Sequence, residues 1–212
     1  MVVHRNPPLP RLPADARFKM ARADAIDAYS GLEIAFARLF AVVLGTKPDL
    51  AGVVLFRVGN SRARNNMIEQ LIKRKYGSKH NSYWNSVFKL VGQLDHTRNE
   101  IVHWTINVLP NFNRSGKLTS ATVLLVPPNI WDRRRGKQKL TERDLKAFAL
   151  KCEFAEAAVW SFVMFALAPR NRKRRAVWLN IFQQPLVYPP PEAHPIRERW
   201  PKRIILLAPS RR

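Results

Sequence analysis

The residues with the clearest chemical potential lie close together, at positions 95–103. This segment contains Arg98, Asn99 and His103. Arginine carries a planar guanidinium group that matches two oxygens of a phosphate, and histidine is the side chain best suited to proton transfer near neutral pH. On a helix, Arg98 and His103 would lie about one and a half turns apart. They could therefore bracket one scissile phosphate, and an RNA substrate would supply its own nucleophile, the 2′-hydroxyl.

The element that would position these residues is a helix predicted over residues 82–104. With a turn of about 100° per residue, its apolar positions fall within about 80° of Arg98. Those positions are Trp84, Val87, Phe88, Val91 and Leu94. Because a buried guanidinium needs an anionic partner, Arg98 is expected to meet either a bound phosphate or a carboxylate, with Asp95 and Glu33 as candidates. A purely structural ion pair, with His103 favoured by the helix dipole, is the alternative.

The run Arg98-Asn99-Glu100-Ile101-Val102-His103 resembles the motif of the HEPN family. In that motif an arginine is followed by a polar residue and, a short distance on, by a histidine near the end of a long amphipathic helix. The resemblance covers residues 15–168. It implies a helical bundle, a homodimer with both motifs facing one cleft, and metal-independent RNA cleavage by Arg98, Asn99 and His103. Asp95 and Glu100 would support them.

The resemblance also suggests the setting in which such a protein acts. Family members work as toxins, in phage defence or in RNA processing, so the expected partners are RNA, a second copy of the chain, and an antitoxin or another neighbouring-gene regulator. Two alternatives remain open from the sequence. One is a non-catalytic RNA-binding or antitoxin-like module, which needs only the basic residues; the other is a purely structural dimer.

The charge of the chain favours a nucleic-acid partner. It carries 37 Lys and Arg against 15 Asp and Glu, a net charge of +22, and each cation that neutralises a phosphate releases condensed counterions. A solvated basic surface is the alternative for each basic run. The candidate RNA-binding residues are Arg62, Arg64, Arg133, Arg134, Arg135, Arg172, Lys173, Arg174, Arg175 and Trp178.

Several other classes are disfavoured. The single cysteine, Cys152, allows no disulfide within the chain and fits a core position. No zinc motif is present, and His96 and His103 would lie about 10 Å apart along a helix, so neither a metal nor a cofactor is expected. The most apolar stretch, residues 147–168, contains three charged side chains, so no membrane span is expected. A cytoplasmic protein is the resulting expectation.

The pattern of apolar residues predicts a mainly α-helical, antiparallel bundle with a small β-hairpin insertion and an extended basic C-terminal arm. Helices are expected at 15–44, 49–58, 61–75, 82–104 and 141–168, and the hairpin at about 105–126, where β-branched runs flank a segment rich in turn residues. Thr141 and Asp144 form a predicted capping box. The domain division is a flexible segment at 1–14, the helical domain at 15–168 and the arm at 169–212.

Overall fold

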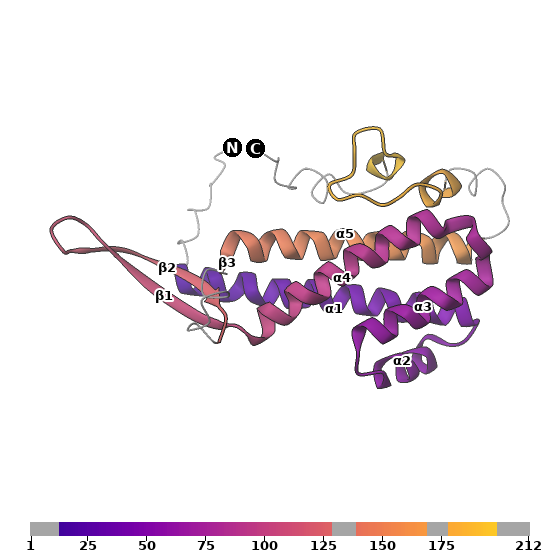
Figure 1. Ribbon diagram of the computed structural model, residues 1–212, viewed down its shortest axis with the longest axis horizontal. Helices are drawn as coiled ribbons and strands as arrows, with labels where there is room; N and C mark the ends of the chain where they lie inside the picture. The colour runs from indigo at the N-terminus through magenta and orange to yellow at the C-terminus, as the bar shows by residue number, and fades with distance from the viewer. Residues whose placement is uncertain (1–12, 129–138, 169–177, 199–212) are drawn as a thin grey trace, which may run out of the picture.

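A computed structural model describes residues 13–128, 139–168 and 178–198 of the chain. It is mainly α-helical and has a small antiparallel sheet (Figure 1). Among the described residues no single helix is both long and apolar enough to span a membrane. Of the helices described, only α1 and α2 taken together meet both conditions, and they are bent by 114° at their junction. The main elements are α1 (Ala14–Leu44), α2 (Pro48–Arg57), α3 (Ser61–Tyr76), α4 (Asn81–His103), β1 (Thr105–Phe112), β2 (Leu118–Val126), β3 (Leu140–Thr141) and α5 (Glu142–Leu167).

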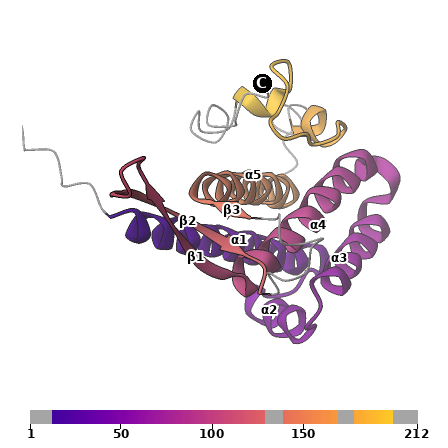
Figure 2. The ribbon, with the colours of Figure 1, turned by 60° about the vertical axis from the view of Figure 1, so that its left-hand side comes forward.

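The centre of the fold is the long pair α1 and α5, which lie side by side (Figures 1 and 2). Small residues let the two backbones approach closely, and larger apolar side chains fill the remaining space. α4 lies obliquely across this pair and buries the apolar face that its sequence predicts. Fully buried residues of this core include Ala25, Leu32, Ala35, Leu39, Trp84, Val87, Cys152, Ala155, Val159 and Phe162.

The short helices α2 and α3 are defined by local signals in the sequence. Gly45 ends α1 with a positive φ of 70°, a conformation that favours glycine. Asn60 caps α3, since its side-chain oxygen accepts hydrogen bonds from the backbone N–H groups of Arg62 and Ala63. At the other end of α3, Lys75 donates to the carbonyls of Val42 and Val43, at 2.7 and 2.9 Å, and so satisfies the end of α1.

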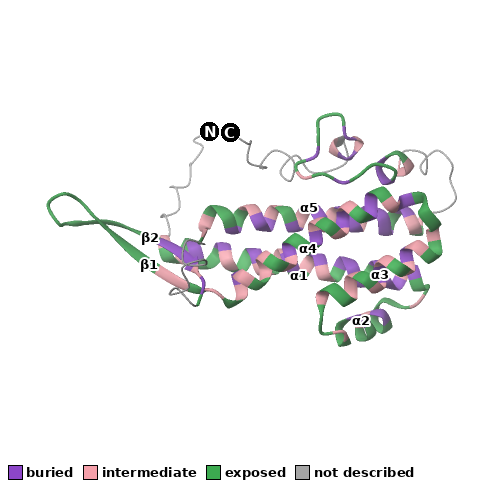
Figure 3. Cartoon of the chain, in the orientation of Figure 1, coloured by how far each residue is buried: buried purple, intermediate pink, exposed green. Residues whose placement is uncertain are grey.

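The hairpin that the sequence predicts is present as β1 and β2. The two strands pair from Thr105 opposite Val126, and the base of β2 is buried at Val123, Leu124 and Leu125. The rest of the hairpin extends away from the helices and is exposed (Figure 3). A third strand, β3, pairs with β2 and leads directly into α5, whose start carries the predicted capping box of Thr141 and Asp144.

The described part of the C-terminal segment, residues 178–198, packs on the helical domain. Ile181, Phe182 and Ile196 are completely buried. Phe182 meets Phe162 and Phe165 of α5 with ring centroids about 5 Å apart, and the backbone N–H of Leu186 donates to the Ser86 hydroxyl at 2.6 Å. These residues therefore belong to the same core as the helices.

Candidate functional site

Arg98 occupies the transition between the buried and the exposed parts of α4. Trp84, Val87, Val91 and Leu94 of the preceding turns are buried, whereas Arg98 is half-buried and Asn99 and His103 are exposed. The guanidinium carbon of Arg98 lies 5.7 Å from the centroid of the Tyr29 ring on α1. The stem of Arg98 can thus follow the apolar face while its charged end reaches the surface.

Arg98 and Asn99 line a cavity of about 390 Å³ at the junction of α1, α3 and α4. Within it, Arg98 Nη1 donates to Asn99 Oδ1 at 3.3 Å. The start of α3 also lines the cavity, and the backbone N–H groups of Arg62 and Ala63 there already donate to the Asn60 side chain. The lining residues are Tyr29, Glu33, Gly59, Asn60, Ser61, Arg64, Asp95, Arg98 and Asn99. Two of the three predicted catalytic residues therefore share a cavity with Arg64, one of the predicted RNA-binding residues.

The carboxylates near Arg98 are already engaged by other groups. Asp95 accepts hydrogen bonds from the Tyr29 hydroxyl and, at 3.3 Å, from Asn65 Nδ2. Glu33 pairs with Arg64 at 2.7 Å. Within the described residues Arg98 forms no ion pair with either carboxylate, so the structural bridge that the sequence left open is not observed. The guanidinium consequently keeps its capacity to bind an anion that enters the cavity.

Tyr29 links the site to the core. Burial, together with the hydrogen bond to the negatively charged Asp95, raises the pKa of the Tyr29 hydroxyl far above its ordinary value, so the phenol stays protonated as a donor. The Tyr29 hydroxyl and the Asn65 amide hold the Asp95 carboxylate, while the Tyr29 ring packs on Phe148 of α5. Arg98 therefore rests on a side chain that is fixed from two directions.

His103 is the last residue of α4 and does not line the cavity of the single chain. It lies one turn beyond Asn99, on the same side of the helix. The helix ends without a left-handed cap, because Trp104 adopts an extended conformation that leads into β1. Arg22 of α1 replaces that cap: its guanidinium donates to the carbonyls of Ile101 and Val102 at 3.0 and 3.1 Å, and to that of Trp104 at 3.5 Å. The backbone on both sides of His103 is thereby fixed.

The remaining predicted site residues are less closely associated with the cavity. Glu100 pairs with the exposed His96 at 3.4 Å rather than with Arg98 or His103. Arg62 is exposed in the first turn of α3. Trp178 is half-buried and stacks on Phe182 at 5.8 Å, so its ring packs on the core. Arg133, Arg134, Arg135, Arg172, Lys173, Arg174 and Arg175 lie outside the described residues.

Alternative chemistries find little support in the described part of the chain. It contains no group of three or more His, Cys, Asp or Glu side chains that could hold a metal ion. Cys152 is fully buried, and burial raises the pKa of its thiol, so it is a poor nucleophile.

Sequence reasoning missed three contributors to this site. Tyr29 follows the apolar periodicity of its helix and therefore looks like an ordinary core residue, although its hydroxyl binds Asp95. Asn60 follows Gly59 in the connection between two helices, and its sequence position alone does not separate it from its neighbours. The structure shows that its side chain caps α3. Arg22 acts on a helix about 80 residues away in the chain, and no local pattern signals that contact.

No family model, curated protein or solved structure matches this chain significantly.

Proposed function

We propose that this chain is a metal-independent endoribonuclease of the HEPN type that acts as a homodimer. The observation that carries the proposal is the state of Arg98. Its guanidinium is half-buried against Tyr29, opens into a cavity next to Asn99, and has no carboxylate partner among the described residues. A cation held in this way is suited to a phosphate, and the net charge of +22 favours a polyanionic substrate.

In the proposed reaction the 2′-oxygen of RNA forms a bond to the adjacent phosphorus and loses its proton to the neutral imidazole of His103. The bond between phosphorus and the 5′-oxygen breaks, and the leaving oxygen takes a proton from the protonated His103 of the second protomer. Arg98 binds the phosphate oxygens as negative charge develops, and Asn99 orients them. The products are a 2′,3′-cyclic phosphate and a 5′-hydroxyl.

A second protomer would supply what the single chain lacks, a histidine close to the phosphate bound by Arg98. His103 is exposed and lies outside the cavity that holds Arg98, so one chain offers a phosphate site and a proton-transfer group that are not enclosed together. An isologous pair across a two-fold axis would bring two histidines and two arginines to one cleft. We place the contact along the α4 helix and its neighbours.

The competing function is a non-catalytic, basic RNA-binding or antitoxin-like interaction module. It is favoured by the same exposure of His103, because a binding surface has no need to enclose a proton-transfer group. The two functions differ in what His103 contributes. An enzyme needs its imidazole, whereas a binding module depends on the cations.

The test is cleavage of a labelled RNA by the purified chain in the presence of EDTA. Arg98→Ala and His103→Ala should each lower the single-turnover rate by about 10²–10⁴-fold, while RNA affinity falls much less. His96→Ala, which removes another exposed histidine of α4, is the matched control and should cleave at the wild-type rate. The new ends should be a cyclic phosphate and a 5′-hydroxyl. If His103→Ala cleaves as fast as the wild type, the binding module takes the place of the enzyme.

A further inference from the structure

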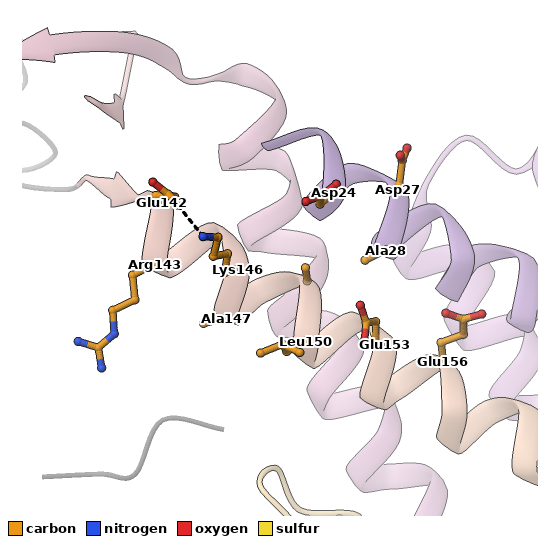
Figure 4. Close-up of a pocket in the computed structure, with 11 residues that line it drawn as sticks. Asp24, Asp27, Ala28, Glu142, Arg143, Lys146, Ala147, Leu150, Glu153 and Glu156 are labelled. Atoms are coloured by element: carbon orange, nitrogen blue, oxygen red, sulfur yellow. Dashed lines mark hydrogen bonds and ion pairs between the residues drawn. The ribbon is translucent and has the colours of Figure 1, made fainter. Parts of the chain in front are cut away.

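A second, larger hollow lies apart from the Arg98 cavity and shares none of its lining residues. It is a groove of about 1060 Å³ between α1 and the N-terminal half of α5 (Figure 4). Its apolar surface comes from Ala28, Ala147, Ala149 and Leu150. The groove is therefore not a polar crevice: it offers an apolar floor on which aliphatic side chains could be buried.

Carboxylates line both sides of this floor. α1 contributes Asp24 and Asp27, and α5 contributes Glu142, Glu153 and Glu156. The groove thus gathers five of the 15 acidic residues of a strongly basic chain. It has two cations, Arg143 and Lys146, of which Lys146 is bound to Glu142. An excess of negative charge remains, and a cationic occupant would neutralise it.

The carboxylates of α1 are available to such an occupant. Asp24 and Asp27 are exposed and form no ion pair within the described residues. On the other wall, Glu156 of α5 lies against Gly31 of α1. Glycine leaves room for the carboxylate there, since a Cβ at Gly31 would lie 2.9 Å from Glu156 Oε2. Burial and the neighbouring charge of Glu153 raise the pKa of the Glu156 carboxyl. A cation in the groove would relieve that repulsion.

The described C-terminal segment contacts α5 next to residues that line this groove. The ring of Tyr188 packs on Phe154 of α5, at a centroid distance of 5.0 Å, and Lys151 Nζ lies 5.9 Å from the same ring. Burial raises the pKa of Tyr188, and the nearby charge of Glu153, which lines the groove, raises it further. Arg197 donates to the carbonyl of Pro190 at 2.9 Å and so keeps the end of the segment close to Tyr188.

Residues 199–212, which lie outside the described residues, have a composition complementary to the groove. They contain no acidic residue and combine five cations with one aliphatic run: Arg199, Lys202, Arg203, Ile204, Ile205, Leu206, Leu207, Arg211 and Arg212. Fourteen extended residues reach up to about 46 Å, and the helix from Glu142 to Glu156 is about 21 Å long. The segment is thus long enough to follow the whole groove.

We infer that the groove between α1 and α5 binds the C-terminal segment of the same chain, residues 199–212. The aliphatic run lies on the apolar floor and the flanking cations meet the carboxylates of the two walls. Docking removes those cations from the surface that could contact a polyanion. This inference does not depend on whether the chain cleaves RNA.

The experiment uses the full chain and two measurements. In the first, a carbodiimide joins a carboxylate directly to the amine of Lys202, with loss of water to the reagent. Mass spectrometry should find Lys202 linked to Asp24, Asp27 or Glu153, and Lys202→Arg, which keeps the charge but cannot be coupled, should abolish these links. In a mixture of ¹⁵N-labelled and unlabelled chains, links within one isotope support the proposal. Links that join the two isotopes at random would assign the groove to a second copy and overturn it.

The second measurement is hydrogen exchange of the amides in residues 199–212. In the Asp24→Asn, Asp27→Asn, Glu153→Gln variant their exchange should become about tenfold faster, as it should for the wild type in roughly 1 M salt. The matched control, Asp15→Asn, Asp49→Asn, Glu69→Gln, removes the same charge outside the groove and should exchange as the wild type does. Equal exchange in the groove variant and the wild type, or the same acceleration in the control, would overturn the proposal.

Discussion

Replacing Arg22 by methionine should uncouple the end of α4 from α1 without changing the Arg98 cavity. Methionine keeps most of the apolar stem of arginine and loses the three hydrogen bonds to the carbonyls of Ile101, Val102 and Trp104. Those carbonyls lie at the end of a helix, where no intrahelical donor exists. The variant therefore tests whether the contact from α1 holds His103 in place.

The expected magnitude follows from the geometry. A hydrogen bond from a charged donor contributes about 1.5–3 kcal/mol when it is well formed, and only two of the three contacts are 3.1 Å or shorter. Arg22 is half-buried, so water can replace part of what is lost. We expect the free energy of unfolding to fall by about 1–2 kcal/mol. Because a misplacement of about 1 Å can cost 10²-fold in rate, single-turnover cleavage should fall by about 10- to 100-fold.

The assays are urea denaturation and single-turnover cleavage of RNA at saturating protein. Arg38→Met is the control, since Arg38 is an exposed arginine of the same helix; it should change the unfolding free energy by less than about 0.5 kcal/mol. Arg22→Lys keeps one donor and should be intermediate in both assays. If Arg22→Met loses stability but cleaves at the wild-type rate, Arg22 stabilises the helix end and does not position His103.

Three further predictions concern the supporting structure. Tyr29→Phe should lower the unfolding free energy by about 1 kcal/mol. The pKa of Tyr29 is raised above 10.0 in the fold, so the unfolded chain loses the phenolic proton first and stability falls as pH rises above that value. Alkaline denaturation should therefore show a flatter decline of stability in the variant than in the wild type. Burial lowers the pKa of His80 below 6.5, so the unfolded chain gains a proton first and stability falls as pH drops below that value. The side chain of Asn in His80→Asn can still donate to the Phe182 carbonyl. Between pH 7.5 and pH 5, urea titrations should show that this variant loses less stability than the wild type, by a difference on the order of 1 kcal/mol. Phe182→Ala should cost about 3–5 kcal/mol and expose residues 178–198 to limited proteolysis, because its ring is fully buried against α5.

The helices could be predicted from sequence because their signals are local. Apolar periodicity, Gly45 after α1 and the Thr141 capping box each act within a few residues, and the observed ends differ from the expected ones by only one or two positions. The start of α3 is set locally as well, because the side chain of Asn60, the residue before the helix, accepts hydrogen bonds from two of its N–H groups. The two-residue strand β3 had no periodic pattern of its own and depends on pairing with β2.

The candidate site was predictable only in its outline. The apolar spacing of residues 82–104 predicts that Arg98 lies on the core-facing side of its helix. Its half-buried position against Tyr29 agrees with that prediction. The choice among anionic partners does not follow, because Asp95 and Glu33 are each taken by a residue from another part of the chain, Tyr29 and Arg64. That both carboxylates are engaged by other residues is a property of the packed bundle.

The two contacts, Tyr29 with Asp95 and Arg64 with Glu33, determine which charged groups of the Arg98 cavity are paired. The raised pKa of Tyr29 keeps its phenol protonated, so its contact with Asp95 is a hydrogen bond from a neutral donor and not an ion pair. Glu33, in contrast, is paired with the cation of Arg64. The cavity therefore contains two guanidinium groups: Arg64 forms an ion pair with Glu33, whereas Arg98 lies near Asp95 but forms no ion pair among the described residues. An anion that reaches Arg98 would therefore not have to break an existing ion pair.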